Sequence, residues 1–147
     1  MITQITFDEI LPIWQNHLWP ERISKIESHS SMNFLSGYDL RNMESIPTFL
    51  AYIEDKQIKG VNSGHMCHNN SYRSRGLWVF PEHRKQGIGV KLLVASIEQA
   101  ALENASSVWS YPKQTSWNTY AAAKFTLASD WEQSELGLNA YCILNLN

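Results

Sequence analysis

Residues 77–93 read LWVFPEHRKQGIGVKLL, and this stretch decides the fold because it joins three different patterns. The run that ends at Phe80 has the aromatic and β-branched composition of a buried strand, and Pro81 stops it. A basic turn with two glycines follows. From about residue 87 to residue 104, apolar residues recur at the spacing of one helical face, namely Val90, Val94, Ile97 and Ala101. The stretch therefore predicts a strand, a turn and an amphipathic helix.

The start of the predicted helix suits an anionic ligand. The first amides of a helix have no partner within it, and the helix dipole adds partial positive charge. Gly87 and Gly89 carry no side chain that blocks a ligand from the backbone, and Arg84 and Lys85 add charge. The sequence is neither a P-loop nor the dinucleotide fingerprint, since Leu92 stands where the third glycine belongs. A solvated turn whose glycines serve only its geometry is the alternative.

The rest of the chain predicts a strand and helices first, then an antiparallel meander, then strand, helix and strand. A capping box, Thr6 to Glu9, opens the first helix. The expected strands are residues 1–6, 48–53, 58–66, 72–80, 107–111 and 137–146. The other expected helices are residues 21–29 and 116–125, and residues 30–45 are expected to form a loop. We predict an α/β fold with a mixed, mostly antiparallel central sheet, helices on both faces, and a single domain over residues 1–147.

Composition narrows the function classes. The 147 residues are 44% hydrophobic and 18% charged, which is typical of a globular domain. A formal net charge of -2 gives no general reason to bind nucleic acid or an anionic membrane. No segment approaches the ~20 apolar residues of a membrane span, and no signal peptide is visible, so we expect a cytoplasmic protein. Cys67 and Cys142 are then expected to be free thiols.

The central stretch resembles a known motif. Arg84-x-x-Gly87-x-Gly89, placed after Val79-x-Pro81, is similar to the acyl-CoA-binding motif of the GNAT superfamily of N-acyltransferases. The resemblance extends in order over about residues 47–146, and we expect the GNAT fold and an acetyl-CoA-dependent N-acetyltransferase of the short phage or bacterial kind. It implies a cofactor site in which strand residues hold the pantetheine arm and turn amides hold the pyrophosphate. The residues so implied are Leu77, Trp78, Val79, Arg84, Lys85, Gln86, Gly87, Ile88, Gly89 and Val90.

The resemblance also implies a catalytic acid. In the family a tyrosine on the last helix, five residues before a phenylalanine, protonates the leaving thiolate, and Tyr120 and Phe125 have this spacing. Lys124 departs from the pattern, because the family has glycine there, and this puts the local turn in doubt. A shifted register would place Phe125 at the acid position. Without the resemblance, Tyr120 is a packing residue with its hydroxyl at the surface.

A general base for the attacking amine is less clear from the sequence. His65, on the strand beside the cofactor strand, titrates in the right range, although a lone strand histidine is usually a hydrogen-bonded core residue. Glu82 and His83 are alternatives that fit a solvated turn equally well. His65 with Cys67 and His68 suggests zinc, but further ligands at suitable spacing are missing, so no metal is expected.

We therefore expect acetyl transfer to a primary amine of a small molecule or peptide, by direct attack. Trp109, Tyr111 and Trp117 are either an aromatic wall for the acceptor or core residues. Acidic residues of the 30–45 loop, Asp39 and Glu44, suit a cationic amine or are merely solvated. The final strand allows a homodimer. The alternative function is a catalytically inactive acyl-CoA-binding regulatory or interaction module.

Overall fold

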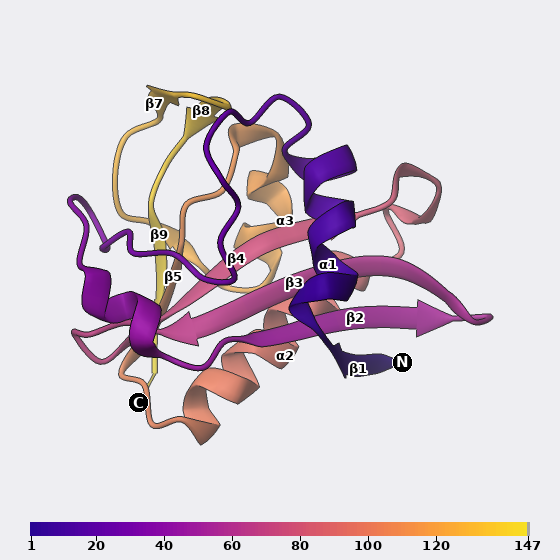
Figure 1. The fold of residues 1–147 in the computed structure, drawn as a ribbon, viewed down its shortest axis with the longest axis horizontal. Coiled ribbons are helices and arrows are strands. Elements are labelled where there is room, and N and C mark those ends of the chain that lie inside the picture. Colours follow the sequence, from indigo (N-terminus) through magenta and orange to yellow (C-terminus); the bar gives the residue numbers. More distant parts are fainter. Residues whose placement is uncertain (147) are drawn as a thin grey trace.

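The computed structural model describes residues 1–146, in which a seven-stranded sheet carries helices on both faces (Figure 1). The strand order is β1-β2-β3-β4-β5-β9-β6, and every neighbouring pair is antiparallel except β4 and β5. A separate two-stranded ribbon pairs β7 with β8. The strands are β1 (Ile2–Ile5), β2 (Thr48–Glu54), β3 (Gln57–Met66), β4 (Ser71–Val79), β5 (Ser107–Ser110), β6 (Thr126–Leu127), β7 (Glu132–Ser134), β8 (Gly137–Asn139) and β9 (Cys142–Asn145). The predicted mixed, mostly antiparallel α/β architecture is confirmed.

Helices of different kinds connect these strands. Three are α-helices: α1 (Phe7–Ile13), α2 (Ile88–Leu102) and α3 (Trp117–Ala122). One π-helical turn, η1 (Trp14–Leu18), continues α1 directly. Three short 3-10 turns complete the set: η2 (Leu40–Glu44), η3 (Pro81–His83) and η4 (Gln114–Ser116).

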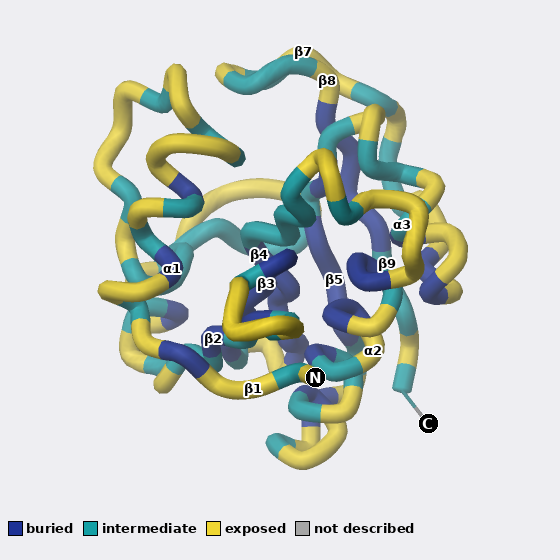
Figure 2. The backbone as a smooth tube through the Cα atoms, turned by 90° about the vertical axis from the view of Figure 1, so that its right-hand side faces the viewer, coloured by how far each residue is buried: buried dark blue, intermediate teal, exposed yellow. Residues whose placement is uncertain are grey.

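The sheet is packed on both faces by separate apolar clusters. On one face α2 and α3 cover a cluster that includes Tyr72, Leu93 and Val108. On the other face α1 and η1 cover a cluster that includes Trp14 and Val61. Figure 2 shows the buried backbone concentrated in β3, β4, β5 and the neighbouring parts of α2, with exposed turns around them. The middle of the sheet is therefore the rigid support from which the carboxyl end of β4 projects.

The first helix begins as the capping box predicts. The Thr6 hydroxyl accepts a hydrogen bond from the Glu9 amide at 3.2 Å, and the Glu9 carboxylate accepts one from the Thr6 amide at 3.0 Å. Pro12 lies inside α1, where it has no N–H to donate. The following turn widens, since the Trp19 amide donates to the Trp14 carbonyl five residues earlier, at 2.7 Å.

The predicted helix at residues 21–29 is wrong, because this segment is irregular. Its backbone groups bond to side chains from distant parts of the chain instead of to one another. The Glu27 carbonyl accepts a hydrogen bond from the guanidinium of Arg75 at 3.0 Å, and the Ile23 amide donates to Glu135 at 3.0 Å. These tertiary contacts replace the helical bonds that the local sequence suggests.

The expected final strand, 137–146, is divided into β8 and β9 by Ala140 and Tyr141. The Ala140 amide donates to the Pro112 carbonyl at 3.3 Å, and the Tyr141 amide donates to the Ser129 hydroxyl at 2.9 Å. These bonds carry the chain from the ribbon to the sheet. The short strands β6 and β7 were not predicted, since their few exposed residues give no periodic signal.

Candidate functional site

Strand β4 contains a bulge that turns its last residues outward. Between the pairs Val61–Trp78 and Ser63–Arg75, β4 has one more residue than β3. Gly76 sits in this bulge with a φ of 82°, in the left-handed region that favours glycine. A β-carbon at Gly76 would lie 2.4 Å from the ring of Trp14, whose Nε1 donates to the Gly76 carbonyl at 2.9 Å.

The bulge stands where β4 and β5 separate. The two parallel strands pair only from Ser71–Ser107 to Arg73–Trp109. Beyond these pairs, the edge of residues 77–79 that faces β5 has no strand partner within the described chain. A wedge therefore opens between the strands, as the family resemblance implied, and it leaves backbone groups free for a ligand that lies along the edge.

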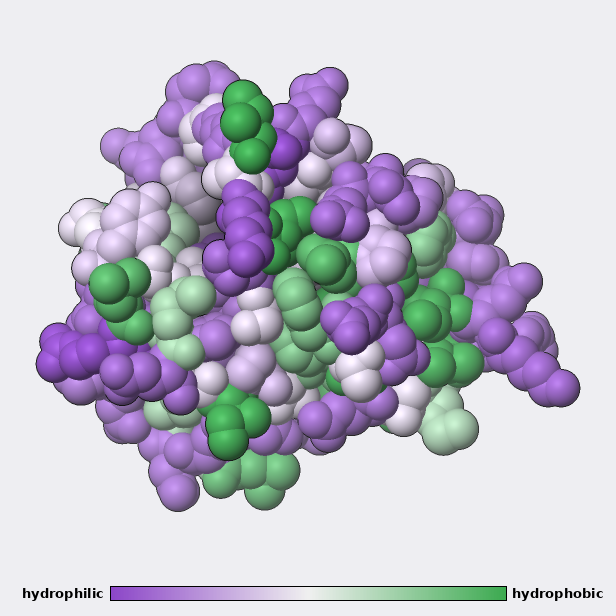
Figure 3. Space-filling model, viewed as in Figure 1, coloured by the Kyte–Doolittle hydropathy of each residue, from purple (hydrophilic) through white to green (hydrophobic). Residues whose placement is uncertain are grey.

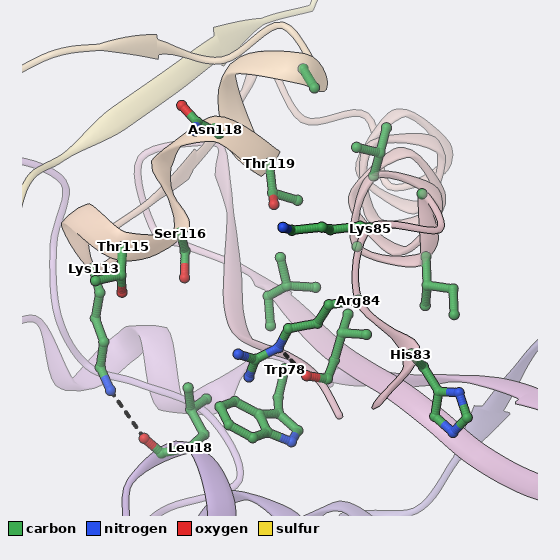
Figure 4. Close-up of a pocket in the computed structure, with 17 residues that line it drawn as sticks. Leu18, Trp78, His83, Arg84, Lys85, Lys113, Thr115, Ser116, Asn118 and Thr119 are labelled. Carbon is green, nitrogen blue, oxygen red and sulfur yellow. Dashed lines mark hydrogen bonds between the residues drawn. The ribbon is translucent and has the colours of Figure 1, made fainter. Parts of the chain in front are cut away.

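A cavity of about 690 Å³ fills this wedge and continues to the start of α2 (Figure 4). Strand β4, the turn before α2, the first turn of α2 and the outer face of α3 all contribute to its wall. All of the predicted cofactor residues line it except Gln86; those present are Leu77, Trp78, Val79, Arg84, Lys85, Gly87, Ile88, Gly89 and Val90. The structure thus brings the residues expected from the motif together around one cavity.

The turn before α2 presents unpaired amides to this cavity. Within residues 1–146, the backbone N–H groups of residues 85–90 donate to no other protein group. Lys85 and Gly87 adopt left-handed backbone conformations, with φ of 63° and 79°. Alternation of right- and left-handed residues aims successive N–H groups into one concavity, which is a geometry for binding anions. The helix dipole of the fifteen-residue α2 adds to the same effect.

Glycine is required at positions 87 and 89 of the motif for two different structural reasons. Gly87 faces open space, so its conformation is what requires glycine there. Gly89 is buried, and a β-carbon on it would lie 2.9 Å from Cγ2 of Thr119 on α3. Gly89 therefore lets α2 and α3 approach each other, which adds a packing role to the ligand access predicted from the sequence.

The exposed side chain of Arg84 lies along the wall of the cavity. Its Nε donates to the Val79 carbonyl at 2.8 Å, and its guanidinium lies 4.6 Å from the ring centre of Trp78 (Figure 4). In the same view the Lys85 side chain extends toward Thr119 across the cavity. Both cations of the motif thus face the space into which the free amides point.

A second, smaller cavity of about 60 Å³ adjoins the first. The two share the lining residues Leu18, Leu77, Lys113 and Ser116. Tyr120 lines the small cavity from α3, where burial raises the pKa of its phenol above the ordinary value. The phenol is therefore protonated at neutral pH, which is the state a proton donor needs.

Lys124, the residue before Phe125, keeps the backbone conformation of the glycine that the family has at this position. Lys124 has a φ of 79°, so a lysine occupies the left-handed position. The Phe125 amide donates to the Tyr120 carbonyl at 3.1 Å, and the Lys124 amide donates to the Ala121 carbonyl at 3.0 Å. These two bonds form a Schellman motif, so the turn that Lys124 put in doubt is intact.

His65 lies apart from both cavities. It is 1% exposed, its Nε2 accepts a hydrogen bond from the Ser30 amide at 3.2 Å, and its ring packs against His29. Burial lowers the pKa of His65 to about 3, helped by the nearby charge of Arg73 and Arg75. A neutral, enclosed imidazole of this kind matches the core-histidine interpretation better than that of a base.

Of the other candidates, His83 lines the large cavity and lies 4.0 Å from the Glu82 carboxylate, whereas the rest fall outside that cavity or take structural partners. Trp109 is fully buried, and Trp117 packs edge-on against Trp131, whereas Tyr111 lines the small cavity. In the 30–45 segment, Asp39 is paired with Arg41 at 2.8 Å. Within residues 1–146, no three His, Cys, Asp or Glu side chains gather closely enough to hold a metal ion. None of the helices in that range has the length and hydropathy for crossing a membrane.

Sequence reasoning missed several residues of the large cavity. Asn118, Thr119 and Ala122 lie on one face of α3, and their helical spacing is a signal that would have found them. Lys113, Thr115 and Ser116 come from the polar turn after β5. Leu18 arrives from the N-terminal segment, and no local pattern in its sequence indicates this.

Comparisons with known proteins agree with this geometry. The family model described as an acetyltransferase (GNAT) domain matches residues 44–126, more than half of the chain. This match includes the β-meander, the motif turn, α2, β5 and α3. No curated protein sequence matches the chain.

Solved structures share the fold at low sequence identity. One is an N-acetyltransferase from Lactobacillus plantarum, with a TM-score of 0.72, 12% identity and 99% of each chain covered. Another is a GNAT-family acetyltransferase from Staphylococcus aureus Mu50, with a TM-score of 0.71, 18% identity, and 100% of this chain and 99% of that one covered. A third, the PaiA N-acetyltransferase from Thermoplasma acidophilum in complex with coenzyme A, has a TM-score of 0.57 and 16% identity over 68% of this chain and 61% of that one.

Proposed function

Because the chain belongs to the GNAT acetyltransferase family, we propose that it transfers an acetyl group from acetyl-CoA to a primary amine of a small molecule or peptide. The family supports an acyltransferase. The coenzyme A complex of a structural neighbour supports the choice of thioester donor. The single observation that carries the proposal is the row of free amides at residues 85–90, which opens into a 690 Å³ cavity.

The diphosphate of acetyl-CoA is the group that this row of amides fits. Its negative charge would meet unpaired N–H groups, the α2 dipole and the side chain of Lys85. The pantetheine arm would lie along the free edge of residues 77–79, as an added strand does. The Arg84 side chain donates to the Val79 carbonyl, so the arm would share or replace that hydrogen bond.

The thioester would then lie in the wedge, beside Tyr120. An amine nitrogen attacks the carbonyl carbon, the carbonyl oxygen gains negative charge, and the carbon–sulfur bond breaks as the carbonyl reforms. The free amide of Val79 on the β4 edge would stabilise the charged oxygen. The Trp78 amide faces β3, on the same side as the Phe80 amide, which donates to the Lys59 carbonyl. Tyr120 would donate its phenolic proton to the leaving thiolate, and the proton lost by the amine would restore the phenol. His65, outside both cavities, receives no role here.

Calorimetry tests the binding half of the proposal. The protein should bind coenzyme A and should bind pantetheine, which lacks the diphosphate, much more weakly. Lys85 lines the cavity and its neighbour Gln86 does not, so Lys85→Ala should weaken coenzyme A binding about tenfold while Gln86→Ala leaves it unchanged. Equal affinity for coenzyme A and pantetheine would show that the amides do not hold the diphosphate.

Release of the coenzyme A thiol tests the chemical half. Acetyl-CoA and a panel of primary amines should give thiol in step with the acetylated amine, and omitting the amine should leave only slow hydrolysis. Coenzyme A binding without thiol release for any amine would instead indicate the acyl-CoA-binding regulatory module. Lys124, where the family has glycine, preserves the turn at the end of α3 and therefore gives no reason to prefer that module.

A further inference from the structure

Two arginines of β4 are buried in the wall of the small cavity. Arg73 is 8% exposed and Arg75 is 4% exposed, and both side chains line the space beside Tyr120. Lys113 lines the same space from the turn after β5. Tyr120 comes from the face of the sheet that α2 covers, and the arginines come from the opposite face, so the cavity passes through the wedge between β4 and β5.

Each guanidinium is held by a few contacts and keeps donors to spare. Arg73 donates from Nη1 to the Ser30 hydroxyl at 2.8 Å and lies 5.0 Å from the ring centre of Trp109. Arg75 donates from Nη1 to the Glu27 carbonyl at 3.0 Å and stacks on the rings of Trp14 and Trp19.

A guanidinium has five N–H donors, so these contacts satisfy only part of each group. The buried Nε of Arg73 has no partner within residues 1–146.

No acidic side chain is paired with either guanidinium. Within residues 1–146, neither arginine takes part in a salt bridge, and the small cavity has no Asp or Glu in its wall. Burial lowers the pKa of Arg73 to about 10 and that of Arg75 well below its usual value. Glu27 lies near enough to raise the pKa of Arg75 slightly, and it is the weakest of the influences on that group.

Burying a charge without a counter-ion is costly in free energy. Uncharged residues of similar size would hold the segment that carries Glu27 and Ser30 at a lower cost in free energy. The burial of two adjacent cations is therefore the feature that requires an explanation. An anion that enters with a ligand would supply the missing charge and the missing acceptors, since guanidinium groups match carboxylate and phosphate oxygens in geometry.

We propose that Arg73 and Arg75 form an anion subsite for the acceptor, and that the acceptor is therefore a small primary amine that also carries a carboxylate, as an amino acid does. This inference rests on the proposed acetyl transfer, because it assigns the small cavity to the substrate of that reaction. Of the two interpretations of Asp39 and Glu44 left open by the sequence, it favours solvated loop residues over groups that attract a cationic amine. The loop acid Asp39 is already paired with Arg41.

The size and position of the cavity agree with this assignment. A volume of about 60 Å³ holds a group of a few heavy atoms and not a whole acceptor. Because the small cavity shares Leu18, Leu77 and Lys113 with the large one, a carboxylate there would keep the amine of the same molecule close to the thioester. A carboxylate held by the two arginines in this way restricts both the position and the orientation of the nucleophilic nitrogen in the same molecule.

Matched acceptors test the proposal directly. Thiol release from acetyl-CoA would be measured with phenylalanine, its carboxamide and phenethylamine, and with the same three forms of a small aliphatic amino acid. The carboxylate form should have the highest kcat/KM, by about ten- to a hundredfold. Phosphoethanolamine and ethanolamine form a second pair, and a preference only in that pair would assign the subsite to phosphate esters. Equal rates for the charged and uncharged forms in every pair would overturn the proposal.

Variants of Arg75 separate recognition from folding. Arg75→Met should reduce kcat/KM for the carboxylate acceptor about tenfold while leaving that for the carboxamide nearly unchanged. Arg75→Lys, which keeps the charge, should retain part of the preference and serves if the Met variant folds poorly. A merely structural arginine would affect both acceptors equally, and that result would contradict the proposal.

A binding measurement that needs no turnover keeps this inference distinct from the proposed function. N-acetylphenylalanine and N-acetylphenylalaninamide would be titrated into the protein with coenzyme A present, and the arginine Nε–H signals followed by ¹H–¹⁵N spectroscopy. The carboxylate should shift signals that are lost in Arg73→Lys and Arg75→Lys, and the amide should not. Identical responses to the two compounds would refute the anion subsite, whereas loss of coenzyme A binding would refute the acetyl-CoA proposal alone.

Discussion

Phe125 and Tyr120 are joined twice at the end of α3: the Phe125 amide donates to the Tyr120 carbonyl at 3.1 Å, and the rings meet edge to face with centroids 5.5 Å apart. Lys124, which lies between Tyr120 and Phe125 in the chain, forms the turn with a φ of 79°. A non-glycine residue in this conformation costs about 1–2 kcal/mol. The turn is kept because the bonds and the ring contact outweigh that cost.

Lys124→Gly should therefore stabilise the protein. We expect the free energy of unfolding to rise by about 1 kcal/mol, because glycine adopts the left-handed conformation without strain, although it also gains freedom in the unfolded chain. Urea unfolding of the two proteins measures the difference. Lys124→Ala removes the side chain without relieving the strain and should give no such gain; an equal gain in both variants would show that the lysine charge, not the backbone, is responsible.

Tyr120→Phe should lower kcat by up to about a hundred- to ten-thousandfold without changing coenzyme A affinity, because it removes the proposed proton donor from the wedge and leaves the proposed diphosphate site intact. Burial places the pKa of Tyr120 above its ordinary value, so the phenol stays protonated as the pH rises through about 10. The wild-type rate should thus not fall in that range on account of Tyr120. If the Phe variant has the same kcat as the wild type at every pH, Tyr120 is not the acid.

Gly89→Ala should destabilise the contact between α2 and α3. The added β-carbon would lie 2.9 Å from Cγ2 of Thr119, and overpacking of this kind costs about 1–3 kcal/mol. Combining it with Thr119→Ala removes the clashing methyl group and should restore most of the stability. Thermal unfolding and coenzyme A calorimetry on the single and double variants give both readouts. If stability returns in the double variant but affinity does not, Gly89 also serves the approach of the ligand.

His65 should make the protein acid-sensitive. Its folded pKa of about 3 lies below the ordinary value, so the folded state binds fewer protons than the unfolded state. The stability contributed by the neutral ring is complete above about pH 6.5 and decreases by about 1.4 kcal/mol for each pH unit below it, until the pH reaches the folded value. Urea unfolding at successive pH values measures this slope, and His65→Gln should reduce it by that amount. Identical slopes for the two proteins would mean that His65 is not buried as a neutral ring.

Much of the fold could be predicted because its strongest signals are local. The strand–turn–helix of residues 77–93 and the capping box at Thr6 depend on neighbours a few positions away. The irregular 21–29 segment could not be predicted, since its backbone partners, such as Arg75, are about 50 residues away in the chain. The bulge at Gly76 was missed for the same reason, because it depends on the ring of Trp14.

The candidate site shows the same difference between local signals and long-range contacts. The proposed cofactor side was visible in the sequence because its motif is contiguous, and all its predicted members except Gln86 line one cavity. The proposed acceptor side was not visible, because charged residues in strands are ordinarily exposed. Arg73 and Arg75 alternate with Tyr72 and Ser74, so the strand pattern alone shows that they share a face but not that both are buried. Figure 3 shows that hydrophilic residues cover much of the surface seen in the view of Figure 1, with apolar residues scattered among them.

The contact between Trp14 and Gly76 has a consequence for motion. The indole of Trp14 fills the space over the bulge, and its Nε1–H donates a hydrogen bond of 2.9 Å to the Gly76 carbonyl, 62 residues away in the sequence. The π-helical turn η1, which carries Trp14 and continues α1, should accordingly open and close with the bulged end of β4 as one cooperative unit. Occupancy of the wedge would then slow hydrogen–deuterium exchange in α1 as well, although α1 itself contributes no residue to the wall of either cavity and η1 contributes only Leu18.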